Sequence, residues 1–528
     1  MPQAHPYREE KHRMWDRSYY DKLKSIREMS RLGGGEERIA RQHAAGKLTA
    51  RERIAMLLDE NSFVEVNGLI ESAASELGMT EKQIPGDGVV TGYGKINGRT
   101  VFVSAQDFTV IGGTLGEAHA KKICHIMDMA LMCRAPFICI NDSGGARIEE
   151  GVSSLDGYSG IFYRNTMASG VIPQISVILG PCAGGACYSP AISDFIFMSR
   201  KTAKMFITGP NVVKVVTGEE VDLDRLGGSS MHEETSGVAH FVCDDDAACL
   251  EGVRALLAYL PDSNEAALPA APPEPVDHIC RIGQIVPDNQ KRSYDVIEVI
   301  GELVDGGRFL EVQSAFAKNV VIGFARMDGR PVGIVANQPR YMSGCLDINA
   351  SDKAARFVRF CDCFGIPLLT LVDVPGFLPG THQEQGGIIR HGAKLLYAFS
   401  EATVPKLCLI MRKAYGGAYI AMNSKNLGAD LVLAWPIAQI AVMGAEGAVD
   451  IICKNELRRA EHPSALRDER IEEYNRRFMN PYVAAKRGYI NEVVTPEETR
   501  ERLIRALDVL KDKSPSCAVR KKHGNIPL

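Results

Sequence analysis

The sequence lacks a long apolar run. None of its 528 residues fall in a stretch of about 18 consecutive apolar residues, the length that a membrane-spanning helix needs. The first twenty residues are charged and contain no apolar core of a signal peptide. The net charge is only -4, so there is no broad basic surface for nucleic acid. We expect a cytoplasmic protein without membrane insertion and without a nucleic-acid partner.

Nucleotide-binding and metal-binding motifs are also missing. There is no GxxxxGK[ST] phosphate loop, and GYGKING lacks the spacing of a dinucleotide fingerprint. The 14 cysteines are scattered, and the close pair Cys361 and Cys363 lies within a helical pattern rather than a zinc ribbon. We therefore expect reduced thiols and no metal in this chain.

Composition divides the chain into four regions. Residues 1–60 are charged, with apolar residues at helical spacing, and predict a helical lead-in. Residues 263–290 are rich in proline and small residues, which disfavour helices and strands, and predict a linker. The segments 61–262 and 291–528 are each long enough for one α/β domain.

The two long segments resemble each other. GYGKINGR at 92–99 matches GFARMDGR at 323–330, and the same displacement places Asp142 over Asp373. One residue later in register, the pair at 184–185 falls on the pair at 416–417. Three matched blocks indicate an internal duplication and favour a function with two related sites.

Each half has the order expected of an α/β domain. A buried-type strand precedes a helical pattern, at 115–133 in the first half and 352–364 in the second, and glycine-rich turns follow the next strands. Amphipathic helices between apolar strands are typical of crossovers that cover a parallel sheet. The sequence therefore predicts two tandem α/β domains.

Glycine pairs at strand ends carry the functional signal. They occur in INDSGGAR and ISVILGPCAGGACYSPA, and their counterparts are LVDVPGFLPG and MRKAYGGAYIAM. A single pair is most often an ordinary turn, but matched turns in both halves favour a binding role. Glycine lets the backbone approach a ligand, and a following helix N-terminus aims free amides at one point. We expect two oxyanion holes.

These motifs resemble a known family. Together with NQPRYMSGCLDINASDKAARFVRFCDCFGIPLL and the terminal KKHGNIPL, they look like the carboxyltransferase (beta) subunits of biotin-dependent acyl-CoA carboxylases of the propionyl-CoA carboxylase type. The resemblance runs from about Arg31 to Leu528. It implies two crotonase-like domains of the ββα superhelix type, with acyl-CoA on the side of 61–262 and biotin on the side of 291–528. It also implies a homo-hexamer with active sites formed across subunits.

The resemblance assigns roles to individual residues. The amides of Gly184 and Gly185 would hold the thioester oxygen, and those of Gly417 and Ala418 the ureido oxygen of biotin. Ile420, directly after GGAY, would border the acyl chain, where an Asp in the family goes with a preference for propionyl-CoA. The other expected contacts are Gly144, Gly145, Ala146, Ala183 and Tyr188 for acyl-CoA, and Gly376, Phe377, Gly416 and Tyr419 for biotin, with Tyr188 and Tyr419 interpreted as equivalent.

The implied reaction needs no side-chain base. Carboxybiotin supplies CO2 and a nitrogen base for the α-proton of a short acyl-CoA, so the protein has only to stabilise two oxyanions. The chain has no biotinylated-lysine motif, since AKMF at 203–206 lacks its context. A partner biotin carboxylase and a biotin carboxyl carrier chain are therefore expected. Propionyl-CoA is the favoured substrate, with acetyl- and butyryl-CoA accepted.

Other interpretations remain open from the sequence. The same motifs occur in the alpha subunit of methylmalonyl-CoA decarboxylase, which serves a sodium pump, and in a transcarboxylase, because one site catalyses both directions. DSGG at 142–145 has the form of a peptidase nucleophile turn, but Ser143 is matched by Val374. His240, His382 and His391 are isolated and more typical of turn or core positions, and Asp142 and Asp373 are expected to cap the following turns. A structural role with inactive oxyanion holes is the non-enzyme alternative.

Overall fold

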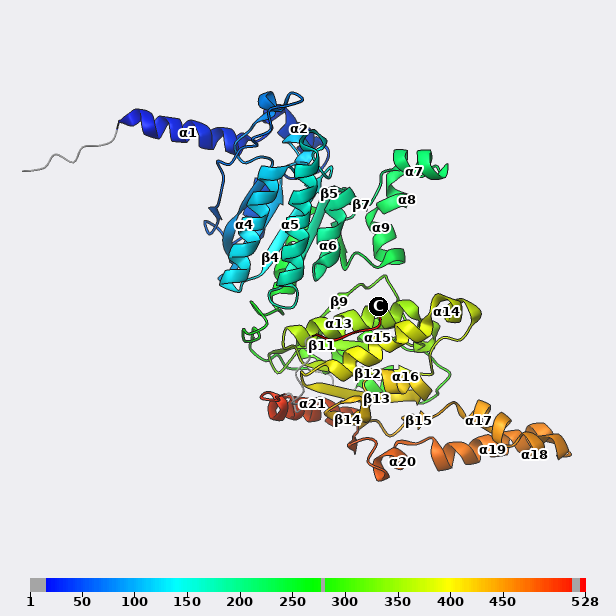
Figure 1. Ribbon diagram of the computed structural model, residues 1–528. Helices are drawn as coiled ribbons and strands as arrows, with labels where there is room; N and C mark the ends of the chain where they lie inside the picture. Colours follow the sequence, from blue (N-terminus) through cyan, green and yellow to red (C-terminus); the bar gives the residue numbers. More distant parts are fainter. Residues whose placement is uncertain (1–15, 277–280, 515–522) are drawn as a thin grey trace, which may run out of the picture.

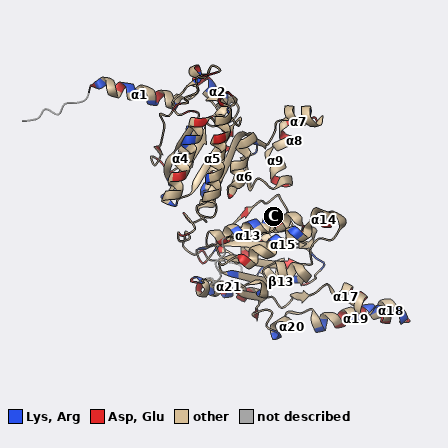
Figure 2. Ribbon diagram, in the orientation of Figure 1, with Lys and Arg blue, Asp and Glu red and all other residues tan. Residues whose placement is uncertain are grey.

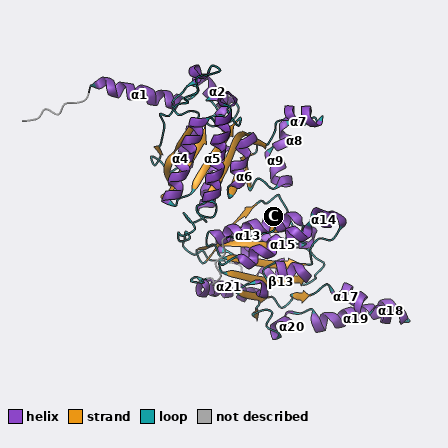
Figure 3. Cartoon of the chain, viewed as in Figure 1, coloured by secondary structure: helices purple, strands orange, loops and turns teal. Residues whose placement is uncertain are grey.

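The computed structural model describes residues 16–276, 281–514 and 523–528, and it has two layered halves (Figure 1). In each half helices pack against a sheet of strands (Figure 3). Helix α1 (Arg17–Leu32) extends away from the first half, and the arm formed by α17 (Ala445–Ile452), α18 (Lys454–Arg459) and α19 (Pro463–Phe478) extends away from the second. The α/β class predicted from the sequence is confirmed.

The two sheets have the same topology. Within the described residues each has eight strands, ordered β1-β2-β3-β4-β5-β6-β8 with β7 beside β5, and β9-β10-β11-β12-β13-β14-β16 with β15 beside β13. The first three strands of each path are antiparallel and the rest are parallel. The bounds in the first sheet are β1 (Val64–Glu65), β2 (Val89–Ile96), β3 (Arg99–Gln106), β4 (Phe137–Ser143), β5 (Gln174–Ala183), β6 (Phe195–Ser199), β7 (Lys204–Phe206) and β8 (Phe241–Cys243). Those in the second are β9 (Phe309–Val312), β10 (Val320–Met327), β11 (Arg330–Asn337), β12 (Leu368–Val374), β13 (Lys406–Tyr415), β14 (Leu431–Ala434), β15 (Gln439–Ala441) and β16 (Glu492–Val493).

The helices follow the same duplicated plan. In the first half α4 and α5 cross between parallel strands, and α13 and α15 do so in the second. The bounds up to the linker are α1 (Arg17–Leu32), α2 (Glu36–Ala44), α3 (Ala50–Leu57), α4 (Glu117–Cys133), α5 (Val152–Ala168), α6 (Tyr188–Ile192), α7 (Pro210–Thr217), α8 (Leu223–Gly227), α9 (Ser229–Met231) and α10 (Asp246–Leu257). Those after it are α11 (Ile282–Ile285), α12 (Val296–Leu303), α13 (Ile348–Cys363), α14 (Thr381–Gly386), α15 (Ile388–Glu401), α16 (Gly416–Ala421), α17 (Ala445–Ile452), α18 (Lys454–Arg459), α19 (Pro463–Phe478), α20 (Pro481–Lys486) and α21 (Pro496–Leu510).

The predicted linker differs in one detail. Residues 261–276 contain neither helix nor strand, in keeping with their prolines, whereas the short helix α11 forms at 282–285. The expectation that no helix forms in the linker is therefore wrong at its C-terminal end. Ile282 of α11 is fully buried and packs with the core of the second half, so tertiary burial stabilises this turn where local sequence does not.

Each sheet contains a matching hairpin, formed by β2 and β3 in the first half and by β10 and β11 in the second. The turn between β2 and β3 is Asn97-Gly98 with φ of 52° and 78°, and the turn between β10 and β11 is Asp328-Gly329 with φ of 53° and 76°. Positive φ at both central residues defines a type I′ turn, which Asn-Gly and Asp-Gly favour and which matches the twist of two antiparallel strands. The first of the three sequence blocks that reveal the duplication is therefore the hairpin turn itself.

Each half also buries one lysine at a matching place in its crossover helix. Lys122 of α4 donates to the carbonyl oxygens of Gly86, at 2.8 Å, and Val89, and burial lowers its pKa to about 8. Lys353 of α13 donates to Val320 at 2.8 Å, and burial lowers its pKa to about 7. Val320 is the counterpart of Val89 at the start of the hairpin, so both lysines fasten a crossover helix to the same point of its sheet.

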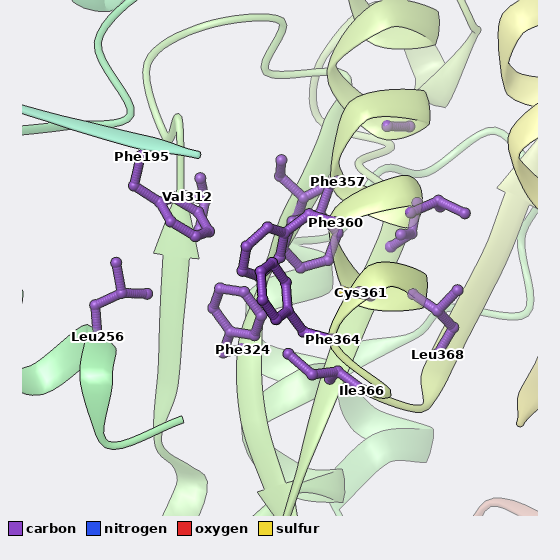
Figure 4. Packing of buried hydrophobic residues seen from close by; sticks show 14 of the residues in the cluster. Phe195, Leu256, Val312, Phe324, Phe357, Phe360, Cys361, Phe364, Ile366 and Leu368 are labelled. Carbon is purple, nitrogen blue, oxygen red and sulfur yellow. The ribbon is translucent and has the colours of Figure 1, made fainter. Parts of the chain in front are cut away.

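Each half has a buried apolar cluster of its own, and a third cluster is shared by both halves. Phe195 of β6 lies edge-on to Phe360 of α13, with ring centroids 4.7 Å apart, and 6.0 Å from Phe324 of β10. Figure 4 shows these rings together with Phe357 and Phe364, where residues from the two halves meet. Side chains from both halves are buried in this one cluster.

The outer surface carries charges of both signs. Figure 2 shows basic and acidic residues interspersed along the outer helices, including the α18–α19 arm. Among the residues that the structure describes, no helix combines the length and apolar character needed to cross a membrane.

A buried ionic cluster joins the N-terminal helices to the first sheet. Arg53 of α3 donates to Asp142 at 2.9 Å and to Asp246 at 2.8 Å, and Lys47 donates to Asp142 at 2.8 Å. Arg53 and Asp142 are fully buried. Removing one partner from such a cluster leaves an unpaired charge in a low-dielectric interior, which destabilises the fold far more than the loss of a surface ion pair does.

We predict that Arg53→Met lowers the free energy of unfolding by about 3–5 kcal/mol. Within the described contacts, Asp246 then loses its only cationic partner, and Asp142 loses one of its two cationic partners. Chemical denaturation monitored by circular dichroism measures the change. Lys121→Met, which removes the exposed Lys121–Glu117 pair, is the control and should change stability by less than about 1 kcal/mol. Equal effects of the two substitutions would contradict the role given to the buried cluster.

Candidate active site

Two equivalent turns connect a buried strand to a short helix. In the first half β5 ends at Ala183 and is followed by a 3-10 turn (Gly184–Cys187) and α6; in the second, β13 ends at Tyr415 and α16 follows directly. The first amides of a helix have no acceptor within that helix. Gly184, Gly185, Gly417 and Ala418, the four expected donors, therefore all lie in a first helical turn, where a backbone amide has no acceptor within its own helix.

Glycine is required at three positions of these turns, for two different reasons. Gly184 has a φ of +63° and Gly416 a φ of +57°, a left-handed backbone that other residues adopt only at a cost. At Gly185 the limit is space, since an added Cβ would lie 3.3 Å from the ring of Tyr158. Gly417 is exposed and open, and an added Cβ would meet only Phe377, at 3.9 Å.

A second turn lies beside the first in each half. After β4, an added Cβ at Gly145 would lie 2.8 Å from the carbonyl oxygen of Ala183, so the two turns of the first half are in contact. Ala146 pairs with Leu115 in a parallel bridge, and Phe377 pairs with Leu346 in the equivalent bridge. Gly144 precedes Gly145 and is exposed, and Gly376 precedes Phe377. The structure thus brings the predicted residues of each half together around one strand-end surface.

The side chains after the glycine turns have different environments. Tyr188 is exposed and contacts Phe162 edge-on at 5.9 Å, and Ile420 is 47% exposed. Tyr419 packs against the core of its half, and burial raises its pKa. With Gly184 over Gly416, Tyr188 corresponds to Ile420, and Tyr419 corresponds to Cys187. The interpretation of Tyr188 and Tyr419 as equivalents is therefore wrong.

The two aspartates that precede the glycine turns, Asp142 and Asp373, do not cap them. Asp142 accepts hydrogen bonds from the side chains of Gln42, Lys47 and Arg53. Asp373 accepts from Arg412 Nε at 2.8 Å and from the backbone amide of Lys413, on the neighbouring strand, at 3.1 Å. The capping expectation is wrong because these carboxylates are fully enclosed and bind buried cations instead.

Sequence reasoning missed the cations beneath the turns. Arg412 is 1% exposed on β13, and its counterpart on β5 is Gly180, where an added Cβ would lie 2.0 Å from Asp142 Oδ1. The first half therefore has no room for a cation on the strand and takes Arg53 from α3. An arginine inside LCLIMRKAY was the available signal for the second half; nothing in the sequence pairs Arg53 with Asp142.

The alternative catalytic residues have structural contacts. Ser143 Oγ accepts the amide of Gly145 at 3.1 Å and so holds the turn. His240 Nδ1 accepts the amide of Ile196 at 3.1 Å, and burial lowers its pKa to about 3, so it is neutral at physiological pH. His391 pairs with Asp352 on the outer helices, and His382 lies on α14.

Metal ligands do not gather at these turns. Within residues 16–276, 281–514 and 523–528, no group of three or more histidine, cysteine, aspartate or glutamate side chains is placed to hold a metal ion. What the turns offer is backbone amides, glycine-lined surface and a few apolar side chains, which suits stabilisation of a developing oxyanion.

The two turns belong to different halves of the chain. Figure 1 shows α6 in the upper half and α16 in the lower half, with α13 and α15 between them. The molecule therefore carries two separate strand-end surfaces of the same design rather than one combined cleft.

Comparisons with known proteins agree on one family. The family description Carboxyl transferase domain matches residues 41–526. The chain is 57% identical to the propionyl-CoA carboxylase carboxyltransferase subunit of Haloferax mediterranei, covering 96% of this chain and 99% of that protein. It is 54% identical to methylmalonyl-CoA decarboxylase subunit alpha of Propionigenium modestum, covering 96% and 98%.

A solved structure matches over nearly the whole fold. Transcarboxylase 12S, described as a hexamer with methylmalonyl-coenzyme A and methylmalonic acid bound, superposes with a TM-score of 0.93 at 52% identity, covering 96% of this chain and 98% of that one. This confirms the crotonase-like fold in two tandem domains and the resemblance drawn from the motifs. The chain belongs to the carboxyl transferase family, as a carboxyltransferase of the propionyl-CoA carboxylase type.

Proposed function

We propose that this chain transfers a carboxyl group from carboxybiotin on a partner chain to the α-carbon of a short acyl-CoA, with propionyl-CoA as the main substrate. The observation that carries the proposal is the pair of matching glycine turns, each with free amides at the start of a helix. The reaction develops negative charge on two oxygens, one on the thioester and one on the ureido group. Two oxyanion holes can each stabilise one of these charges.

The turn of the first half serves acyl-CoA in this proposal. The amides of Gly184 and Gly185 bind the thioester oxygen and stabilise the enolate when the α-proton leaves. Gly144, Gly145 and Ala146 border the thioester, and Ala183 and Tyr188 complete the surface. The left-handed φ of Gly184 and the contact of Gly145 with Ala183 fix these amides before substrate arrives, so little reorganisation is needed during the reaction.

The turn of the second half fits the ureido group of biotin. Gly417 is exposed, and the nearest obstacle to an added Cβ is the Phe377 ring at 3.9 Å, so a flat ring can reach the amides of Gly417 and Ala418. Gly376, Phe377, Gly416 and Tyr419 line this surface. When bound, carboxybiotin supplies both CO2 and the nitrogen base that takes the α-proton. This chain's own contribution is to orient that group, hold its oxygen and exclude water.

The separation of α6 and α16 supports a shared active site. Since the two turns lie in different halves of one chain, acyl-CoA and biotin meet if the first half of one subunit faces the second half of another. A relative described as a hexamer agrees with a homo-hexameric assembly for this chain. Its further partners are a biotin carboxylase and a biotin carboxyl carrier chain, in the cytoplasm. The domain boundaries at 61–262 and 291–528 belong to the same proposal.

Decarboxylation and transcarboxylation are the alternatives. Relatives bearing the names methylmalonyl-CoA decarboxylase subunit alpha and methylmalonyl-CoA carboxyltransferase 12S subunit are 54% and 53% identical to this chain, against 57% for the propionyl-CoA carboxylase subunit of Haloferax mediterranei. The oxyanion chemistry is the same in both directions. The partner chain sets the net direction, so copurification with a biotin carboxylase is the expected result for the carboxylase function.

The first functional prediction is that the purified chain exchanges carboxyl groups between methylmalonyl-CoA and free biotin without ATP, because the described turns bind both oxygens without a nucleotide. Transfer of radiolabel from methylmalonyl-CoA that carries a labelled carboxyl group to free biotin measures the exchange. Strict dependence of this partial reaction on ATP would rule out the proposed function.

The second functional prediction concerns Gly417→Val, which should lower the rate of carboxyl transfer by about a hundredfold or more and leave the affinity for acyl-CoA unchanged. The reason is that the branched side chain crowds only the ureido oxygen. Steady-state transfer and equilibrium acyl-CoA binding measure the two effects. Gly283→Val is the control, since an added Cβ there has no atom within 4 Å. Activity of Gly417→Val within a few-fold of wild type would show that the biotin assignment is wrong.

The third concerns acyl choice at Ile420. An apolar wall separates acyl chains that differ by one methylene by only about 1–3 kcal/mol, so wild type should accept acetyl-, propionyl- and butyryl-CoA. Ile420→Asp should narrow this range toward propionyl-CoA and change the ratios of kcat/KM by about tenfold. Ile389→Asp, at an 80% exposed position on α15, is the control. Unchanged ratios in Ile420→Asp would mean that other residues set chain length.

A further inference from the structure

Two buried thiols lie on either side of the first glycine turn. Cys182 is the penultimate residue of β5 and Cys187 ends the 3-10 turn, so the four residues between them are Ala183, Gly184, Gly185 and Ala186. Their exposures are 0% and 5%. Both are free cysteines in the structure. The turn that contains the glycine amides therefore has a buried cysteine at each end.

The contacts of the two thiols place them against each other. The single S–H of Cys187 is shared between the carbonyl oxygen of Cys182, 2.8 Å from Sγ, and that of Phe206, 3.2 Å away, and Cys182 Sγ donates to the carbonyl oxygen of Ala186 at 3.3 Å. Each thiol thus bonds to the backbone beside the other. The neighbouring Cys182 side chain lowers the pKa of Cys187, whereas the neighbouring Cys187 side chain, together with burial, raises the pKa of Cys182.

The second half has no such pair. The counterparts of Cys182 and Cys187 are Ala414 and Tyr419, so only the turn assigned to acyl-CoA is flanked by sulfur. Catalysis at either turn needs amides, not thiols, and the second half forms an equivalent turn without them. The pair is therefore a feature of the first half that the carboxyl-transfer reaction does not use.

We propose that Cys182 and Cys187 form a reversible disulfide when the protein meets a hydroperoxide, and that this bond inactivates the acyl-CoA turn. The inference rests on the proposed function for its effect on activity, but not for the formation of the bond.

The chemistry balances with hydrogen peroxide as the oxidant. The sulfur of Cys187 attacks one peroxide oxygen, the O–O bond breaks, and a sulfenic acid and one water molecule form. The sulfur of Cys182 then attacks Cys187, the S–O bond breaks, and the oxygen leaves as a second water molecule. The two sulfurs together lose two electrons, and the peroxide is reduced to water. A dithiol such as dithiothreitol reverses the change.

The disulfide alters the turn because its geometry is narrow. It requires Cβ atoms about 3.5–4.5 Å apart and a dihedral near ±90°, so the sulfur of Cys187 has to leave the carbonyl oxygens of Cys182 and Phe206. Both cysteines are covalently continuous with Gly184 and Gly185, whose amides are set by the left-handed φ at Gly184. A shift at either end of this short segment moves the amides away from the thioester oxygen.

The test treats the full-length protein with hydrogen peroxide, blocks the remaining thiols, and maps tryptic peptides. The peptide Asn165–Arg200 contains these two cysteines alone and should lose the mass of two hydrogen atoms. Carboxyl exchange should fall about a hundredfold, with a matching loss of acyl-CoA affinity, and dithiothreitol should restore both. No disulfide in this peptide, or a complete disulfide with full activity, would overturn the proposal.

Matched variants separate this pair from other thiols. Cys187→Ala and Cys187→Val should both keep their own starting activity through peroxide treatment, so a folding defect in one leaves the other as a test. Cys243→Ser removes a second close thiol pair, with Cys249, that lies away from the turn, and should be inactivated like wild type. Inactivation of both Cys187 variants would overturn the proposal. Absence of exchange in untreated wild type would instead refute the proposed function, while the peptide mass still reports the disulfide.

Discussion

A buried cation against a buried carboxylate supports each half of this molecule. Arg53 with Asp142 in the first half and Arg412 with Asp373 in the second lie directly beneath the strand ends from which the glycine turns emerge. Such pairs tolerate burial only when every charge has its partner and its hydrogen bonds, so they impose a fixed geometry on the backbone around them. Because Arg53 comes from α3, the helices before the first sheet are part of the first half in physical terms. A fragment beginning at residue 61 would enclose Asp142 without Arg53 and Lys47.

The two halves have the same framework of strands and helices, but the buried cation beneath the glycine turn comes from a different element in each half. The hairpin turns, the buried lysines Lys122 and Lys353, and the order of the strands are common to both halves. The cation beneath the turn is not common to both halves. Arg412 lies on β13 itself, whereas Gly180 occupies the equivalent position on β5 in the first half. The two halves could therefore specialise for different ligands without altering the strand ends that hold the amides.

Much of this could be predicted because the signals were local. The duplication, the α/β class and the glycine turns rest on residues close in sequence, such as Asn97-Gly98 and Gly184-Gly185, whose backbone preferences do not depend on the rest of the fold. The ionic cluster joins Arg53 to Asp142 across 89 residues, and α11 forms through tertiary burial of Ile282, so neither had a local signal. The aspartates were misinterpreted for the same reason: a carboxylate before a glycine turn suggests a cap until its surroundings are known.

The shared aromatic core has a consequence for how the molecule comes apart. Phe195 belongs to the first half, yet it packs against Phe324 and Phe360 of the second, so opening this cluster from one half exposes residues of the other, while each half keeps a further apolar cluster of its own. The cluster that contains these rings therefore couples the stability of one half to that of the other. Substitutions at the rings act on both halves together, whereas substitutions at Ile123 or Leu303 act first on the separate cluster of one half.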